Sequence, residues 1–180
     1  MINYEFLLPE ILFVGAISII IVIDLFLTEK YKYLSYYFIQ LLLFLSIYII
    51  YSNMYYLETN ISTLYDTNYF SSFFKIFILF SLTIIFYYTY KFLINFNLYK
   101  TEYFIISLFG VLGMMIMISA NHLLLLYLGI ELLSLSLYSV IAFNKQSIDS
   151  SEAAVKYYIL GAMSSGFLLF GISLIYGLTG

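Results

Sequence analysis

Glu131 lies near the middle of an apolar segment, residues 122–143, whose sequence is HLLLLYLGIELLSLSLYSVIAF and which is long enough to cross a membrane as a helix. The helix is centred near Leu133, so a rise of about 1.5 Å per residue places the carboxylate about 3 Å from the midplane. An ionised acid at this depth costs roughly 2.5–3.5 kcal/mol, and a neutral acid still needs hydrogen-bond partners. Such a residue is typical of a proton or ion relay inside a helix bundle. The alternative is a structural hydrogen bond between two helices.

Three polar residues continue along the helical face that carries Glu131. Tyr127, Ser134 and Tyr138 stand four residues before it, three after it and seven after it. These spacings bring side chains onto one face of a helix. The sequence therefore predicts a polar stripe directed at neighbouring helices.

Lys156 is the second candidate for charge translocation. It lies about eight residues from the centre of the next predicted helix, near an end where its stem could reach water. Glu152 precedes it by four residues, which is the spacing of an ion pair on one helix. Position and spacing fit a structural lysine and a functional lysine equally well.

Three further polar residues favour structural roles. Lys75 lies about one turn inside the third predicted helix, and Asp24 lies near the end of the first; both positions favour contacts between helices over a relay. His122 immediately precedes the helix of Glu131. A lone histidine cannot form a metal cluster, so a capping or interface role is expected there.

The composition indicates a membrane protein without a redox or metal centre of its own. Of the 180 residues, 64% are hydrophobic and 9% are charged, against roughly a half and a quarter in soluble domains. The mean hydropathy is +1.02. One histidine and no cysteine cannot hold a haem pair or an iron–sulfur cluster. A net charge of −3 does not suggest a nucleic-acid partner.

Six apolar runs predict an all-α membrane protein with six transmembrane helices in a single membrane domain, residues 1–180. The polar, acidic stretch after the second run predicts a surface loop. The predicted helices cover about residues 8–27, 33–51, 70–90, 103–120, 123–143 and 153–176.

The lysines between the predicted helices indicate the orientation. Alternating helices place the first, third and fifth connections on one face, and these hold Lys30, Lys32, Lys91, Lys100 and Lys145. By the positive-inside rule this face points to the cytoplasm or mitochondrial matrix, and both termini point the other way. The start of the chain lacks the features of a signal or transit peptide, so the first helix is expected to remain. Abundant residues of AT-rich codons indicate an organelle genome and a mitochondrial inner membrane.

Four motifs after residue 100 carry a family resemblance, and two earlier motifs support it. They are NHL (121–123), LGIELLSLSLY (128–138), EAAVKYYILGA (152–162) and SSGFLLFGISLIYG (164–177), with VIDLF (22–26) and YFSSFFKIFIL (69–79) before them. In this order they resemble the amino-terminal six-helix portion of NADH dehydrogenase subunit 2, the antiporter-like membrane subunit of respiratory complex I.

This resemblance implies a proton-translocating subunit. In the family, the glutamate of the fifth helix, here Glu131, pairs with a lysine of the seventh helix in an axis of charged residues. The family's sixth-helix lysine matches Lys156. NADH, FMN, iron–sulfur clusters and ubiquinone would bind other subunits, so no cofactor is expected in this chain. Other membrane-arm subunits of complex I and lipids are the expected partners.

The family continues beyond a sixth helix, and this sequence does not. Gly161 with Ser165, and Ala162 with Gly166, form small-residue pairs that predict close packing of another helix on the sixth. The sequence begins with Met1 and ends in a loop-like LTG, which suits a split gene whose second chain supplies the missing helices. A longer polypeptide and a reduced subunit are the alternatives.

Two other function classes fit parts of this pattern. A subunit of a related cation/proton antiporter or membrane hydrogenase would share Glu131 and the helices. A non-transporting structural scaffold would keep the helices but would not need a carboxylate at the midplane. The AT-rich composition and the density of the motifs favour complex I.

Overall fold

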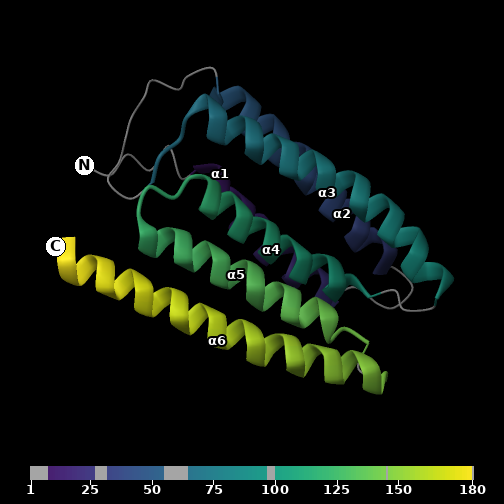
Figure 1. Cartoon of the computed structure of the whole chain (residues 1–180). Helices are drawn as coiled ribbons and strands as arrows, with labels where there is room; N and C mark the ends of the chain where they lie inside the picture. Colours follow the sequence, from purple (N-terminus) through teal and green to yellow (C-terminus); the bar gives the residue numbers. More distant parts are fainter. Residues whose placement is uncertain (1–7, 27–31, 55–64, 97–99, 145, 180) are drawn as a thin grey trace.

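The described residues form six long helices (Figure 1). The computed structural model describes residues 8–26, 32–54, 65–96, 100–144 and 146–179. All six helices are long and apolar enough to cross a membrane, which confirms the predicted fold class. They are α1 (Leu8–Phe26), α2 (Lys32–Met54), α3 (Tyr69–Asn95), α4 (Thr101–Ile118), α5 (Leu123–Ile141) and α6 (Ile148–Thr179).

α2, α3 and α6 extend beyond the predicted ranges, whereas α1, α4 and α5 end one or two residues earlier than predicted. α6 begins at Ile148 because Ser147 caps it. The backbone N–H of Ser150 donates to Ser147 Oγ at 3.3 Å, and that of Ser151 donates to the Ser147 carbonyl at 3.2 Å. α3 likewise continues past Lys91 to Asn95. Polar residues such as Lys91 are compatible with a helix, so a search for apolar runs alone ends α3 too early and begins α6 too late.

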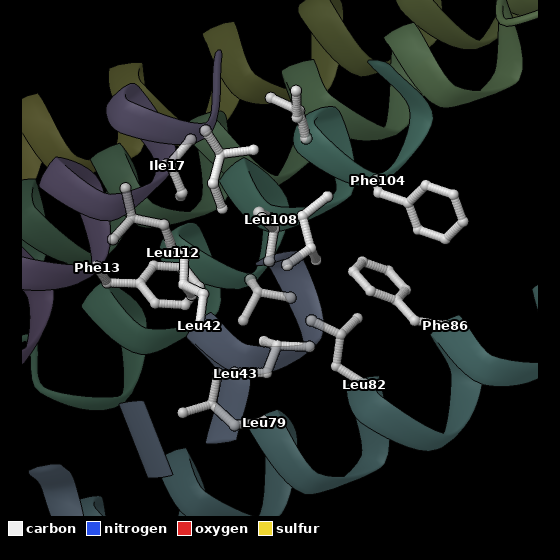
Figure 2. Packing of buried hydrophobic residues seen from close by; sticks show 14 of the residues in the cluster. Phe13, Ile17, Leu42, Leu43, Leu79, Leu82, Phe86, Phe104, Leu108 and Leu112 are labelled. Carbon is white, nitrogen blue, oxygen red and sulfur yellow. The ribbon is translucent and has the colours of Figure 1, made fainter. Parts of the chain in front are cut away.

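The first four helices form the core of the bundle. Figure 2 shows large apolar side chains of these helices converging. α5 packs on α4, and among the described helices α6 packs only on α5 (Figure 1). Most large apolar side chains of α6 are therefore exposed. The buried cluster includes Phe13 and Ile17 of α1, Leu42 and Leu43 of α2, Leu79, Leu82 and Phe86 of α3, and Phe104, Leu108 and Leu112 of α4.

Two glycines bring α4 and α5 into close contact. A Cβ atom on Gly129 of α5 would lie 2.6 Å from Cγ of Met117 and 2.9 Å from the carbonyl oxygen of Gly113. A Cβ atom on Gly113 of α4 would lie 2.7 Å from the carbonyl oxygen of Gly129. Larger residues here would force the helices apart, because backbone atoms cannot yield as a flexible side chain does. This contact fixes the position of α5, and hence of Glu131, at the edge of the core.

Successive helices run in opposite directions, so α1 begins and α6 ends at the same end of the bundle (Figure 1). At the other end, α2 begins at Lys32, Lys100 precedes α4, and Lys91 lies in the last two turns of α3. Lys30 and Lys145 lie outside the described residues. The described connection lysines thus gather at one end, as the predicted orientation requires.

Single cysteines at Ser52 and Gln146 test this arrangement. Ser52 lies in the last turn of α2, and Gln146 is exposed between α5 and α6, at the opposite end of the bundle. Because the chain has no native cysteine, a membrane-impermeant maleimide reports each position without background. In sealed vesicles we expect labelling of one position only, and of the other only after the vesicles are inverted. Labelling of both positions from the same side would contradict the alternation of the six helices.

Candidate functional site

Glu131 lies at the centre of α5. It is next to Leu132, the central residue of the 19 that span Leu123 to Ile141. Its side chain is half-buried, and its Oε2 atom is buried without a hydrogen-bond partner among the described residues. A buried polar atom without a partner costs free energy, because it has lost its hydrogen bonds to water and has formed no other hydrogen bond. Glu131 therefore needs a partner that the described residues do not supply.

The carboxylate of Glu131 lies on the side of α5 that faces away from α4. Gly129 and Ser136 contact α4, and about 3.6 residues per turn place Glu131 on the opposite side of the helix. Tyr138 shares the side of Glu131, and its ring lies against Gly161 of α6. This side of α5 is therefore covered by α6 at the level of Tyr138.

The predicted polar stripe on α5 does not satisfy Glu131. Ser134 Oγ donates to the carbonyl oxygen of Ile130 at 2.8 Å, within its own helix. Tyr138 packs edge-on against Tyr157 of α6, with ring centroids 5.3 Å apart. These side chains share a face with Glu131 but hydrogen-bond or pack elsewhere.

Lys156 is exposed near the start of α6 and lies far from Glu131. Its ammonium forms the predicted i,i+4 ion pair with Glu152, with Nζ 2.5 Å from Oε1. Tyr138 of α5 and Gly161 of α6 are in contact and so lie at the same level of the bundle. Because the two helices are antiparallel, Glu131 lies on one side of this level and Lys156 lies on the other. At a rise of 1.5 Å per residue they are separated by about 18 Å along the helix axes. The structure does not bring these two candidate residues together.

His122 and Asp24 have the structural contacts that their positions predict. His122 caps α5, since its Nδ1 atom accepts from the backbone N–H of Leu124 at 3.3 Å. Its Nε2 atom lies 2.7 Å from the hydroxyl of Tyr176, which joins the start of α5 to the end of α6. Asp24 Oδ1 accepts from Ser35 Oγ at 2.6 Å and so links α1 to α2.

Lys75 forms a buried ion pair that the sequence did not reveal. Its Nζ atom lies 2.7 Å from Oε1 of Glu10, and the two side chains are 2% and 6% exposed. Glu10 belongs to the first turn of α1, whereas Lys75 is two turns inside α3. Lys75 is therefore an interface residue, as predicted.

The sequence position of Glu10 did not indicate a buried ion pair, because an acidic residue is common in the first turn of a helix for a local reason. It stabilises the positive end of the helix dipole. The position of Lys75 could have predicted an acidic partner. An ammonium in the amino-terminal half of an apolar helix is not stabilised by the helix dipole and therefore needs an acid. The sequence alone did not indicate which acid, because the partner comes from a distant helix.

Tyr65 completes this buried group. The Lys75 ammonium donates to the Tyr65 hydroxyl at 3.0 Å. Tyr65 forms an isolated β-bridge with Ala120, and the next backbone N–H, of Asp66, donates to the carbonyl of Ser119 at 2.9 Å. Burial, followed by the neighbouring Glu10 carboxylate, raises the pKa of Tyr65 well above its usual value. The phenol therefore stays protonated.

Within the part of the chain that the structure describes, no three histidine or acidic side chains gather as metal ligands. The ionisable groups inside the bundle are carboxylates, ammonium groups and phenols. These groups exchange protons and shift charge.

Comparison with known proteins identifies relatives for most of the sequence. Residues 120–180 match the family described as NADH:quinone oxidoreductase/Mrp antiporter, TM. A protein named NADH-quinone oxidoreductase subunit N, from Ruthia magnifica subsp. Calyptogena magnifica, is 43% identical over 176 residues, which are 96% of this chain and 36% of the relative. The chain thus spans about a third of the length of the curated relatives it matches.

Solved structures show the same fold. Respiratory complex I from Thermus thermophilus contains a chain that matches with a TM-score of 0.75 and 23% identity, covering 96% of this chain and 37% of that one. An archaeal membrane-bound sulfane sulfur reductase contains a chain that matches with a TM-score of 0.74, also at 23% identity and the same coverage. The six-helix arrangement therefore recurs in respiratory membrane complexes that have different names.

The two lysine ion pairs should differ sharply in their contribution to stability. Lys75→Met leaves the Glu10 carboxylate buried and unpaired, and such a loss costs about 3–5 kcal/mol. Lys156→Met breaks an exposed pair worth about 0.2–1 kcal/mol. We expect Lys75→Met to lower the amount of folded protein in membranes and its thermal unfolding midpoint, and Lys156→Met to leave both nearly unchanged. Equal effects of the two substitutions would contradict the observed difference in burial.

Proposed function

We propose that this chain is the amino-terminal part of an antiporter-like, proton-translocating membrane subunit of respiratory complex I. The observation that carries the proposal is the position of Glu131, a half-buried carboxyl group at the centre of an apolar helix with one oxygen unpartnered among the described residues. The segment that matches the family, residues 120–180, contains both Glu131 and Lys156. High identity to proteins named subunit N of NADH-quinone oxidoreductase supports complex I.

The chemistry proposed for Glu131 is a change of protonation driven by a neighbouring cation. In an apolar site, desolvation favours the neutral acid, whereas an ammonium close by favours the carboxylate. If a lysine outside this sequence approaches and withdraws, Glu131 loses and regains a proton. Such a switch passes charge displacement to its neighbours. Lys156 lies too far from Glu131 to be this cation, and we assign it to charge movement nearer the start of α6.

We propose subunit 2 as the subunit to which this chain belongs, on the resemblance of its six sequence motifs; the relatives named subunit N support complex I. In this proposal NADH, FMN, iron–sulfur clusters and ubiquinone bind other subunits, and this chain holds no cofactor. Its partners are other membrane-arm subunits and lipids. The relatives come from bacteria or archaea, so the location we propose is an energy-transducing membrane. The mitochondrial inner membrane stays a prediction from composition.

Further helices should cover α6. Its large apolar side chains are mostly exposed, and a Cβ atom on Gly166 would meet nothing within 4 Å. Gly161, by contrast, is already covered by Tyr138. The pair of Ala162 and Gly166 is thus available for close packing of another helix. The relatives are almost three times as long as the matched part, and we propose that the corresponding helices pack here.

A subunit of a cation/proton antiporter or another respiratory membrane complex is the second candidate. The family description includes an antiporter, and the sulfane sulfur reductase chain has the same fold. Glu131 would serve the same chemistry there. A non-transporting scaffold has less support, because it gives no reason for a carboxyl group at the centre of α5.

Glu131→Gln tests the proposed role. The amide keeps the size and most hydrogen bonds of the side chain but cannot titrate, and a positioned proton-transfer group commonly contributes a factor of about 10²–10⁴. We expect normal assembly of the complex with NADH-driven proton pumping lowered at least about tenfold.

The matched control is Glu102→Gln, since Glu102 is an exposed acid in the first turn of α4. It should leave pumping unchanged. Normal assembly and a normal proton-to-electron ratio in Glu131→Gln would mean that the carboxylate is structural.

Purification in mild detergent tests the proposed partners. We expect an affinity tag on this chain to recover flavin- and iron–sulfur-containing subunits that oxidise NADH. A density map should place a further helix against Ala162 and Gly166. Recovery of a set of cation/proton antiporter subunits would favour the second candidate, and a density map with lipid alone at Ala162 and Gly166 would refute the proposed helix contact.

A further inference from the structure

The buried pair of Glu10 and Lys75 is poorly explained by stability alone. Both residues lie inside helices that are long and apolar enough to span a membrane, and they are 5% and 2% exposed. Removing two charges from water is costly, and replacing a buried ion pair with well-packed apolar residues is often neutral or stabilising. Ionisable side chains inside membrane bundles are usually functional. The pair therefore needs a reason beyond holding α1 against α3.

Tyr65 gives the pair a third proton-bearing group in a fixed position. Its hydroxyl accepts from Lys75 at 3.0 Å, and the Lys75 ammonium also lies 5.1 Å from the centre of the Tyr65 ring. The β-bridge to Ala120 anchors Tyr65 to the turn between α4 and α5. The carboxylate and the ammonium thus lie beside a phenol that stays protonated and holds the ammonium in place.

A cavity of about 420 Å³ borders this group. Glu10 and Tyr65 contribute to its wall, together with apolar residues of α1, α4 and α5. Ile11 and Val14, which also line it, are largely exposed, so the cavity opens at the surface of α1. Its wall is almost wholly apolar, and apolar cavities stay dry, so water enters only when separation of the pair turns a polar atom of Glu10 or Tyr65 towards it.

The carboxylate is closed off from this cavity while the ion pair is intact. Both carboxylate oxygens of Glu10 are buried. Exchange of a proton with water therefore requires the pair to separate. Neutralisation favours separation, because a proton that leaves Lys75 Nζ and binds Glu10 Oε1 converts the two ions into a neutral amine and a neutral acid.

We infer that Glu10, Lys75 and Tyr65 form a second proton-exchange site of the bundle, at the end where α1 begins. A proton moves from the ammonium of Lys75 to the carboxylate of Glu10 without change in net charge, and the separated pair then exchanges protons with water in the cavity. Asp66 and His122 are the other described carboxylate and imidazole at this end. The site lies opposite the end that holds the described connection lysines. The inference rests on the proposed function; in the predicted orientation this end faces away from the cytoplasm or mitochondrial matrix.

Lys75→Arg separates proton exchange from structure. A guanidinium keeps the positive charge and the ion pair with Glu10, but it does not release its proton in proteins. In membranes that contain the assembled complex, we expect Lys75→Arg to assemble normally and to lose proton pumping relative to NADH oxidation. Lys91→Arg is the matched control, because Lys91 is exposed and lies over the Tyr87 ring at the other end of α3. It should pump normally. Normal pumping by Lys75→Arg would overturn the inference.

The double variant Glu10→Gln with Lys75→Met provides a second, independent measurement. It removes both charges, so neither is left buried alone. We expect assembly to recover relative to Lys75→Met and pumping to remain low. Recovery of both assembly and pumping would show that the pair is purely structural.

Glu131→Gln in the same membranes distinguishes the two claims. Loss of pumping in Glu131→Gln with normal pumping in Lys75→Arg would refute the second site and leave the proposed function standing. Normal pumping in both would refute the proposed function as well.

Discussion

An ionisable side chain inside an apolar helix must find a partner, because lipid offers none. Most such residues in this chain have one. Lys75 pairs with Glu10, Asp24 accepts from Ser35, and Lys156 pairs with Glu152. Glu131 is different, since its buried Oε2 atom has no hydrogen bond and its carboxylate has no ion pair among the described residues, whereas Glu10 is paired with Lys75. The need of Glu131 for a partner connects the fold to the proposed function.

The position of Glu131 follows from packing elsewhere in the bundle. The apolar core of α1 to α4 forms a stable base, and the glycine contact of α4 with α5 sets the depth and rotation of α5. The same contact turns Glu131 away from α4 towards the side where α6 and its exposed apolar face lie. α6 covers this side of α5 at the level of Tyr138, so a group that reaches the carboxylate has to approach beside α6.

Much of the fold could be predicted from the sequence, because lipid makes long apolar runs nearly sufficient evidence for helices. The ends were less certain, since the polar first turn of α6 depends on the cap at Ser147 and not on hydropathy. The capping role of His122 followed from its position before the apolar run. The pair of Glu10 with Lys75 could not be predicted, because it depends on how α1 and α3 are placed relative to each other. The separation of Lys156 from Glu131 has the same cause: spacing along one helix says nothing of the register between two.

Infrared difference spectroscopy of the assembled complex tests the central claim most directly. Spectra of membranes before and after addition of NADH report the carbonyl stretch of protonated carboxyl groups. The account predicts a carboxyl signal that changes during turnover in the native complex and is missing in Glu131→Gln. Identical difference spectra of the native complex and this variant, at equal turnover, would show that Glu131 does not change protonation and would contradict the account.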